Sequence, residues 1–326
     1  TEIFIVNNRF EECETNAGSH YIGFASCRRF IVKGNTFKGD KGNPIHIEED
    51  CRDFVITDNI IRFNTASANG AITVQENNVG GVNANPIRGE ISNNIIHYQG
   101  VAKTTQTYGI HLIFDGTATT PGEQITVKDN QIHGCEYGII NGTYAQDAVS
   151  IYDNKAYNCG TGYLLKHQPS VFKDNQSVEC DVGIEDDYGC NIVNHVFDRC
   201  ADPVDASARS DCVCINPTYM DYFATTLAAS NNETKIVDAI AGSRMYGFLS
   251  VGANVSNNDS AMASNLFQVT WDGTTLTATQ RITKEPGFTS TDFVNTASEL
   301  RVRNFTNSAG VDLKVTASLS GQVTYT

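Results

Sequence analysis

Basic side chains are scarce in this chain of 326 residues, where 23 Lys and Arg face 37 Asp and Glu for a formal net charge of −14. A chain with this balance has little cationic surface for gripping a phosphate backbone, so we expect no nucleic-acid partner. Long apolar runs are absent too, since no stretch approaches the roughly 20 apolar residues that span a bilayer. The first residues contain neither a basic start nor an apolar signal region. We therefore expect no membrane partner.

Zinc-binding patterns are also missing, although the chain has ten cysteines. No Cys-x2-Cys pair occurs, and Cys212 and Cys214 are too close together for the usual zinc knuckle. We expect no metal site and no cofactor. The thiols are expected to be mostly reduced and buried, where they pack as small hydrophobic groups. Such thiols are typical of a protein that folds in a reducing cytoplasm.

The composition changes near Pro217. All cysteines and histidines precede that residue, whereas the three methionines and the single Trp271 follow it. Residues 1–217 carry 16 basic and 28 acidic side chains, a charge of −12, while residues 218–326 carry 7 and 9, a charge of −2. We therefore predict two domains, 1–217 and 218–326, with the acidity concentrated in the first.

A short repeat runs through the first domain. Its marker is an Asn that follows a short apolar run and a turn residue, and His195 takes that place in an eighth copy. The seven marker residues are Asn8, Asn35, Asn59, Asn94, Asn130, Asn154 and Asn175. Successive markers lie 20 to 36 residues apart, and the third residue before each is apolar in every copy. Internal self-similarity at this period indicates a repeat architecture.

Each copy holds a second apolar strand, and its anchor residues are Ile22, Ile45, Ile72, Ile110, Ile139, Tyr163, Ile184 and Val204. Short strands separated by Asn and Gly turns, without a 3.6-residue apolar period, predict a parallel β-helix rather than a helical repeat. Stacked coils bring equivalent residues about 4.8 Å apart. The marker Asn should therefore form a ladder of side-chain amides, at a turn where Asn tolerates left-handed backbone.

This coil pattern, an Asp-Asn or Asn-Asn turn, an apolar residue, a Cys and a later Gly-Ile, resembles the right-handed, single-stranded parallel β-helix of the pectate-lyase-like superfamily. Within it, residues 1–217 look most like a bacteriophage tailspike depolymerase. The resemblance implies an all-β homotrimer on the virion tail that binds and cuts bacterial surface polysaccharide, either capsule or O-antigen. It also implies folding in the host cytoplasm, action at the bacterial cell surface, and attachment to the phage tail through a region preceding Thr1. The family has no invariant catalytic motif to carry over.

Residues 218–326 are free of Cys and rich in Thr, Asn and Ser, and they read as successive strands separated by Gly, Asn and Asp turns. This pattern predicts a C-terminal antiparallel β-sandwich. Such a domain would also cover the open edge of the solenoid, which otherwise invites aggregation. We expect it to serve trimerisation first and carbohydrate binding second.

Three neighbouring insertions, 75–90, 99–108 and 114–123, should leave the solenoid as loops and form the walls of a groove. Outward positions beside the second strand then place polar side chains on one face over about three coils. Glycoside hydrolysis requires two carboxyl groups, about 5–5.5 Å apart for retention or 6.5–9.5 Å for inversion. The predicted catalytic residues are Glu48 and Glu76, with Asp115 as a substitute. The predicted substrate-binding residues are His46, Gln75, His111, Tyr108, Phe114 and Lys103.

Alternatives remain open for this site. Residues 47–50 also read as a solvated acidic corner, and a second carboxylate cluster, Glu185, Asp186, Asp187 and Asp205, ranks lower because no insertion surrounds it. A polysaccharide lyase on the same fold needs a base and a cation that neutralises a uronate, and calcium at the acidic corner would suit it. The acidity of the solenoid favours hydrolysis of a less anionic substrate. A non-catalytic receptor-binding adhesin and a secreted pectinase-like enzyme would share the fold.

Overall fold

The computed structural model describes the chain in segments that contain only strands and turns. These segments are 2–11, 20–39, 43–63, 70–75, 77–79, 82–84, 87–99, 103, 107–113, 124–142, 149–167, 169–205, 213–215, 217–227, 233–238, 243–255, 258–271, 276–284, 291–295, 299–304 and 311–325. Within them no helix is long and apolar enough to cross a bilayer. The chain divides into two compact units, one of residues 1–191 and 200–209, the other of residues 192–199 and 210–326.

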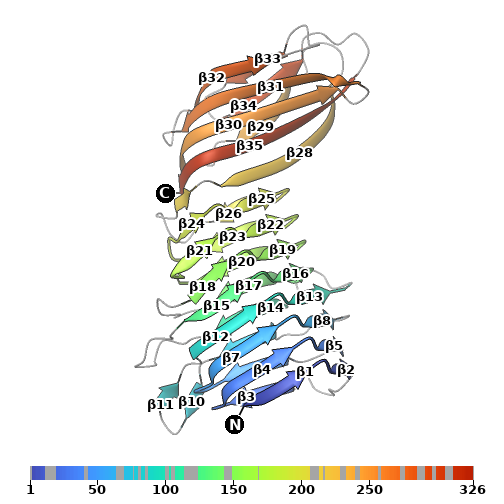
Figure 1. Cartoon of the computed structure of the whole chain (residues 1–326). Helices are drawn as coiled ribbons and strands as arrows, with labels where there is room; N and C mark the ends of the chain where they lie inside the picture. Colours follow the sequence, from blue (N-terminus) through green and yellow to red (C-terminus); the bar gives the residue numbers. More distant parts are fainter. Residues whose placement is uncertain are drawn as a thin grey trace. The chain divides into compact units, whose positions relative to one another are not determined.

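The first unit is built from three parallel sheets, to each of which a coil contributes one strand, and a separate antiparallel pair of β10 (Asn77–Val79) and β11 (Val82–Ala84) (Figure 1). Sheet A contains β1 (Ile3–Val6), β4 (Arg28–Lys33), β7 (Arg52–Thr57), β12 (Ile87–Ser92), β15 (Ile125–Lys128), β18 (Val149–Tyr152) and β21 (Val171–Lys173). Sheet B contains β2 (Arg9–Glu11), β5 (Thr36–Gly39), β8 (Ile60–Phe63), β13 (Ile95–Tyr98), β16 (Gln131–His133), β19 (Lys155–Tyr157) and β22 (Gln176–Val178). Sheet C contains β3 (His20–Ala25), β6 (Asn43–Glu48), β9 (Gly70–Gln75), β14 (Tyr108–Ile113), β17 (Tyr137–Asn141), β20 (Thr161–Leu165), β23 (Val182–Asp186) and β26 (Asp202–Asp205). The predicted parallel β-helix is confirmed.

The Asn ladder lies between sheets A and B, and it is buried from Asn35 to Asn175, while Asn8 of the first coil is exposed. Asn59 is typical, because its side-chain amide donates to the carbonyl of Val32 at 2.9 Å and to Oδ1 of Asn94 at 3.0 Å. The left-handed backbone, however, belongs to the residue before each ladder Asn, as at Asp58 and Asn93, with φ of 58° and 54°. The expectation that the ladder Asn itself is left-handed was wrong. A left-handed residue turns the chain, and the following Asn then points its amide inward along the stack.

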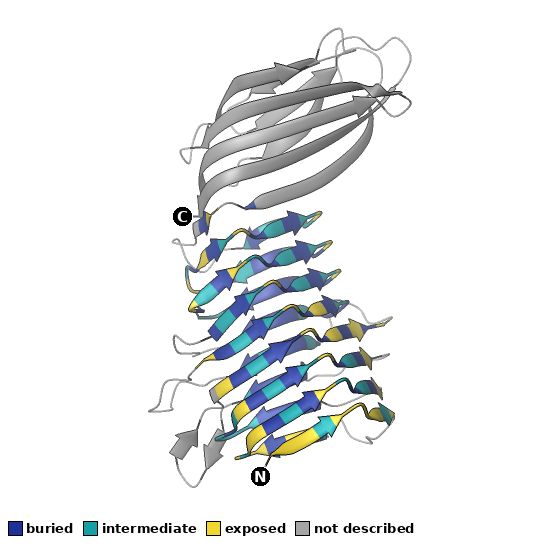
Figure 2. Cartoon of the chain, in the orientation of Figure 1, coloured by how far each residue is buried: buried dark blue, intermediate teal, exposed yellow. Residues whose placement is uncertain are grey.

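Alternation along each strand sends one set of side chains into the solenoid and the other outward (Figure 2). The interior is made of stacked columns of Ile, Val and Phe, such as Phe30 on Phe54 with ring centroids 5.5 Å apart. Eight cysteines fall in the described residues; all are free thiols and six are buried. Burial raises the pKa of Cys51 to about 11, which makes it an unreactive packing group.

The second unit contains the short strands β24 (Asn191–Val193), β25 (Val196–Asp198) and β27 (Val213–Ile215), followed by long antiparallel strands. One group comprises β28 (Thr218–Leu227), β30 (Ser243–Val255), β31 (Asn258–Trp271), β32 (Leu276–Lys284) and β35 (Val311–Tyr325). A separate sheet comprises β29 (Glu233–Asp238), β33 (Thr291–Asn295) and β34 (Glu299–Asn304). The sandwich and the boundary at residue 217 stay predictions.

Candidate functional site

The outward face of sheet C carries the predicted polar positions in two columns. Parallel register places His46 beside Thr73, and Thr73 beside His111. The second column places Glu48 beside Gln75, and Gln75 beside Ile113. Neighbouring positions in such a ladder are about 4.8 Å apart. The structure therefore brings Glu48, Gln75, His46 and His111 onto one surface.

Glu48 and His46 form a hydrogen-bonded pair at the end of β6. His46 is 6% exposed, and its Nε2 lies 3.4 Å from Oε2 of Glu48. Its Nδ1 lies 3.3 Å from the side-chain amide of Asn43, which can only donate, so Nε2 carries the proton and donates to Glu48. The ring also stacks on His20 at 4.2 Å. Burial lowers the pKa of His46 despite the opposing effect of Glu48, so this imidazole is neutral near pH 7 and holds the carboxylate in place.

His111 and two tyrosines make up the neighbouring part of this face. Burial, assisted by the positive charge of Lys166, lowers the pKa of His111 to about 4. Tyr108 lies against it with ring centroids 4.7 Å apart, and stacks on Tyr137 of the next coil at 5.9 Å. At neutral pH the imidazole of His111 is uncharged, so it can form hydrogen bonds but cannot act as an acid.

The other predicted site residues are placed differently. The Lys103 ammonium donates to the carbonyl of Glu179 at 3.1 Å and to Oδ1 of Asp181 at 3.0 Å, at the turn before β23. It is held there rather than at the Glu48 pair. Glu76, Phe114 and Asp115 lie outside the described residues, so the pairing of Glu48 with Glu76 stays a prediction.

A second group of carboxyls lies farther along the same face of sheet C. Glu185 of β23 stands in register with Asp205 of β26. The pKa of Glu185 is raised by burial and by the charges of Asp187 and Asp205, against the smaller effects of Lys166 and a 3.5 Å hydrogen bond from Thr161. The structure thus gives this lower-ranked cluster a carboxyl that holds its proton to higher pH than usual.

Asp186 of the same predicted cluster has a structural role instead. Its side chain is 1% exposed and accepts hydrogen bonds from the backbone N–H groups of Tyr188, Gly189 and Cys190 at 3.0, 3.0 and 2.6 Å. A carboxylate that caps a turn in this way is committed to the backbone. Asp186 therefore does not belong with Glu185 and Asp205.

Glu136 is a candidate that the sequence reading missed. Burial raises its pKa, and its Oε2 is buried without a hydrogen-bond partner among the described residues. Both Glu136 and Glu185 interact electrostatically with the phenol of Tyr137, whose pKa they raise together with burial. The only sequence signal was that the acidic Glu136 immediately precedes the aromatic Tyr137. A Tyr that interacts with two half-buried carboxyls from different coils is an arrangement that only the stacking of coils creates.

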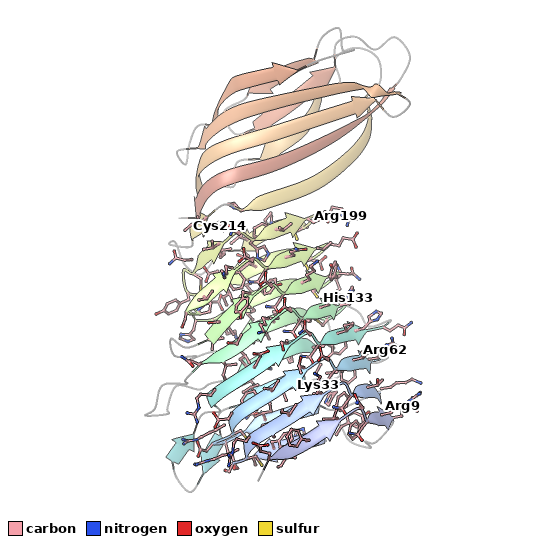
Figure 3. The ribbon with its side chains drawn as sticks, in the orientation of Figure 1. Arg9, Lys33, Arg62, His133, Arg199 and Cys214 are labelled. Carbon is pink, nitrogen blue, oxygen red and sulfur yellow. The ribbon has the colours of Figure 1, made fainter. Side chains whose placement is uncertain are left out.

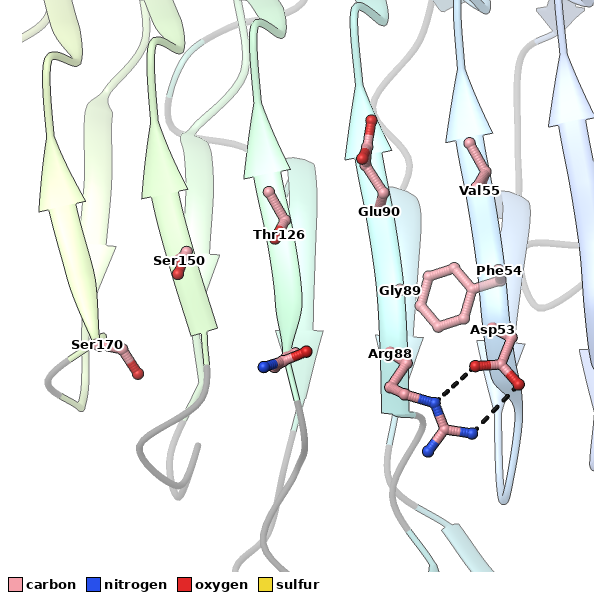
Figure 4. A pocket seen from close by; sticks show the side chains of 10 residues that line it. Asp53, Phe54, Val55, Arg88, Gly89, Glu90, Thr126, Ser150 and Ser170 are labelled. Atoms are coloured by element: carbon pink, nitrogen blue, oxygen red, sulfur yellow. Dashed lines mark hydrogen bonds and ion pairs between the residues drawn. The ribbon is translucent and has the colours of Figure 1, made fainter.

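The outward face of sheet A contains a groove of about 800 Å³, which the sequence also did not indicate (Figure 4). At one end Arg88 binds Asp53 through both carboxylate oxygens, at 2.6 and 3.2 Å. This pairing holds the pKa of Asp53 below its usual range. Hydroxyl and amide groups line the rest of the groove, from Gln124, Thr126, Ser150 and Ser170. The groove is suited to binding, because its remaining carboxyl, Glu90, is engaged by Lys128 and Ser92.

Within the described residues, no three or more His, Cys, Asp or Glu side chains gather as ligands for a metal ion.

Comparison with known proteins gives matches among solved structures alone. No protein-family model and no curated protein matches the chain. The chain resembles phage tailspikes. The capsular polysaccharide depolymerase gp49, a tailspike from Acinetobacter baumannii bacteriophage Fri1, shares 10% identity over 98% of this chain and 71% of its own, with a TM-score of 0.24. The tailspike of Acinetobacter phage vB_ApiP_P1 shares 12% sequence identity over 98% of this chain and 81% of its own, with a TM-score of 0.22.

A third similar structure is WceF from Pantoea stewartii, a glycan biofilm modifying enzyme with a tailspike-like parallel β-helix. It shares 10% identity over 98% of this chain, which spans 58% of that protein, with a TM-score of 0.28. At these identities the likeness concerns the fold, which the strand register establishes independently.

Proposed function

We propose that the protein is a polysaccharide depolymerase that hydrolyses glycosidic bonds of bacterial capsule or O-antigen along the outward face of sheet C. The observation that carries the proposal is the in-register pair of Glu185 and Asp205, in which one carboxyl has a raised pKa. Glycoside hydrolysis needs one carboxylic acid to protonate the leaving oxygen and a second, ionised carboxylate on the other side of the reacting carbon.

Glu185 takes the part of the general acid in this proposal. Burial and the charges of Asp187 and Asp205 raise the pKa of Glu185, so it keeps its proton to higher pH than an ordinary glutamate, and the hydroxyl of Thr161 donates to one of its oxygens. Asp205 on the next coil supplies the second carboxyl group. Adjacent strands are about 4.8 Å apart, which is nearer to the spacing of about 5–5.5 Å in retaining enzymes than to that in inverting ones.

Glu48 offers a second position for the same chemistry. Its oxygen is held by a neutral His46, and Glu76, the partner expected from the sequence, belongs to the next coil. Glu48 and the Glu185 pair lie on the same face of sheet C. Polysaccharide is long enough to contact both regions, so one can bind while the other cleaves.

The decisive experiment incubates the intact protein with capsule and lipopolysaccharide preparations from Gram-negative bacteria. Reducing ends and absorbance near 235 nm are followed together for wild type, Glu185→Gln, Asp205→Asn and Glu48→Gln. The control is Asp58→Asn, which removes an exposed carboxylate at a left-handed turn position that Asn also favours. We expect new reducing ends without absorbance, lost by at least about 100-fold in Glu185→Gln, since general acid catalysis contributes this much.

Other outcomes would identify the alternatives. Rising absorbance would mean a lyase, since elimination leaves an unsaturated sugar. Loss of activity in Glu48→Gln with Glu185→Gln unaffected would move catalysis to the first pair. A polymer that binds tightly without either signal would make the protein an adhesin.

We further propose that the chain works as a homotrimer on the virion tail, with the second unit contributing to assembly. Light scattering of the 326-residue chain tests the assembly, and a mass of three chains is the expected result. A monomer that still cleaves polysaccharide would contradict the trimer without affecting the hydrolysis.

A further inference from the structure

Three cations, Lys38, Arg62 and Lys155, lie on the middle coils of the outward face of sheet B in this acidic protein. Five consecutive coils place one side chain each in a single column, which we call the cationic stripe. Register sets Lys38 beside Arg62, Arg62 beside His97, His97 beside His133, and His133 beside Tyr157. Arg62 and His133 project from the same side of the solenoid (Figure 3). At about 4.8 Å per coil the stripe is roughly 19 Å long.

Among the described residues, no carboxyl lies in this column between Lys38 and Tyr157. The parallel column beside the stripe reads Thr36, Ile60, Ile95, Gln131 and Lys155. Neither Arg62 nor Lys155 forms an ion pair with another described residue. Lys38 has Glu11 as its neighbour in register, but Arg9 already holds that carboxylate.

The cations of sheet A behave differently. Lys33 lies 3.5 Å from Asp58, Lys128 lies 3.3 Å from Glu90, and Lys173 lies 3.4 Å from Asp174. The chain has 14 more acidic than basic side chains, so it contains enough carboxylates to pair with every cation. Arg62 and Lys155 on sheet B nevertheless have no ion-pair partner among the described residues, which leaves their charge available to an external anion.

Aromatic rings and apolar groups accompany these charges. His133 stacks on Tyr157 with ring centroids 4.5 Å apart and an interplanar angle of 8°, and His97 lies 5.6 Å from His133. Ile95 beside them is 41% exposed. Flat rings with cations at a coil-to-coil repeat suit a linear polymer of rings that bear anionic groups, because the sugar faces pack on aromatics while charged substituents bind the cations.

We propose that the cationic stripe is a binding face for acidic polysaccharide, separate from the candidate cleavage site on sheet C. The inference goes beyond the proposed function, since it concerns retention of polymer on another face of the solenoid. It also qualifies the expectation from net charge, because an overall charge of −14 does not describe this surface. The acidic polymer is expected to lie along the solenoid, crossing one coil after another.

A second copy of the chain is the less favoured occupant. In a cyclic assembly whose axis follows the solenoid, each coil faces the corresponding coil of its neighbour. The carboxyl cluster of Glu185, Asp202 and Asp205 lies on the coils after those of the stripe. The two charged surfaces are therefore out of register in such an assembly.

The test measures binding of the intact 326-residue protein to alginate, a polyuronate, at 4 °C and low salt, with dextran as the neutral polymer and poly-L-glutamate as the non-glycan anion. The variant Lys38→Gln/Arg62→Gln is compared with Lys33→Gln/Lys173→Gln, which removes the same charge from ion-paired positions of sheet A. We expect the stripe variant to bind alginate at least about tenfold more weakly, and the sheet A variant to bind within about twofold of wild type.

Tyr157→Ala separates glycan recognition from simple charge attraction. It should weaken alginate binding and leave poly-L-glutamate binding unchanged. Equal losses in both double variants, no alginate binding by wild type, or equal binding of dextran would overturn the proposal. A change of oligomeric state in the stripe variant, seen by light scattering, would assign the stripe to a second copy and would also overturn it. None of these readouts requires cleavage, so failure of the hydrolysis proposal would be recognised separately.

Discussion

The side-chain amide of Asn94 donates to Oδ1 of Asn130 at 3.0 Å, although 36 residues separate the two in sequence. The same amide donates to the carbonyl of Ile56 at 3.0 Å, and Oδ1 of Asn94 accepts from both the backbone and the side chain of Asn59. Each ladder Asn thus ties its own turn to the turns before and after it. The ladder holds successive coils at one spacing, and the side-chain columns on the outer faces depend on that spacing.

Replacing Asn94 by Ala should therefore destabilise the solenoid well beyond the loss of one contact. The buried backbone N–H of Asn59 would lose its acceptor, and the side chains of Asn59 and Asn130 would each lose one hydrogen bond, so we expect about 2–4 kcal/mol lower free energy of unfolding. Urea denaturation followed by circular dichroism measures the change. Gln99→Ala, at an exposed position, is the control and should stay within about 0.5 kcal/mol of wild type. An unchanged urea midpoint for Asn94→Ala would contradict a stabilising ladder.

Gly89 should tolerate no side chain, because a Cβ there would lie 1.9 Å from Cζ of the buried Phe54 ring. We expect Gly89→Ala to cost about 1–3 kcal/mol through overpacking. Adding Phe54→Leu frees space and should recover part of this loss relative to Phe54→Leu alone. Gly23→Ala is the matched control, since its nearest neighbour would be 3.7 Å away on an exposed strand position. Thermal unfolding of the four variants checks the coupling.

The pH dependence of cleavage should follow the charges around Glu185. If Glu185 acts as the acid, activity falls as pH rises through its raised pKa, because the proton is then lost. Asp187→Asn removes a charge that raises this pKa, so the alkaline limb should shift to lower pH. Lys166→Met removes a charge that lowers it, so the limb should shift to higher pH. Rates measured against pH for both variants decide the matter, and shifts in the same direction would exclude Glu185 as the titrating group.

His111 should make the fold sensitive to mild acid. Its pKa is about 4 in the folded protein and 6.5 in its reference state, so the unfolded chain binds the proton first as pH falls. The stability that depends on a neutral His111 is present above pH 6.5 and is lost as pH falls toward 4. His111→Gln should flatten the stability profile in this window. The exposed His97→Gln serves as the control, and an equal flattening by both variants would contradict this assignment.

Much of the fold could be predicted from the sequence because its determinants are local. The marker Asn, the apolar residue three positions before it and the second-strand anchor recur within each coil, and a coil of short strands can bury its apolar side only by stacking on another. The period therefore indicated the β-helix and the columns, including the register of His46 with Thr73 and His111. Cys51 could likewise be recognised as a buried thiol.

The tertiary structure decided which residues become neighbours on each outer face of the solenoid. Glu136 and Glu185 meet Tyr137 because coils of different length stack at one spacing, so residues far apart in sequence become neighbours. The same stacking assembled the sheet A groove from Asp53 and Arg88 and the cationic stripe from Lys38 to Tyr157. Local pattern determined that this chain forms a solenoid. Its surface chemistry arose only when burial and neighbouring charges acted on those columns, because each pKa and each ion pair depends on residues from other coils.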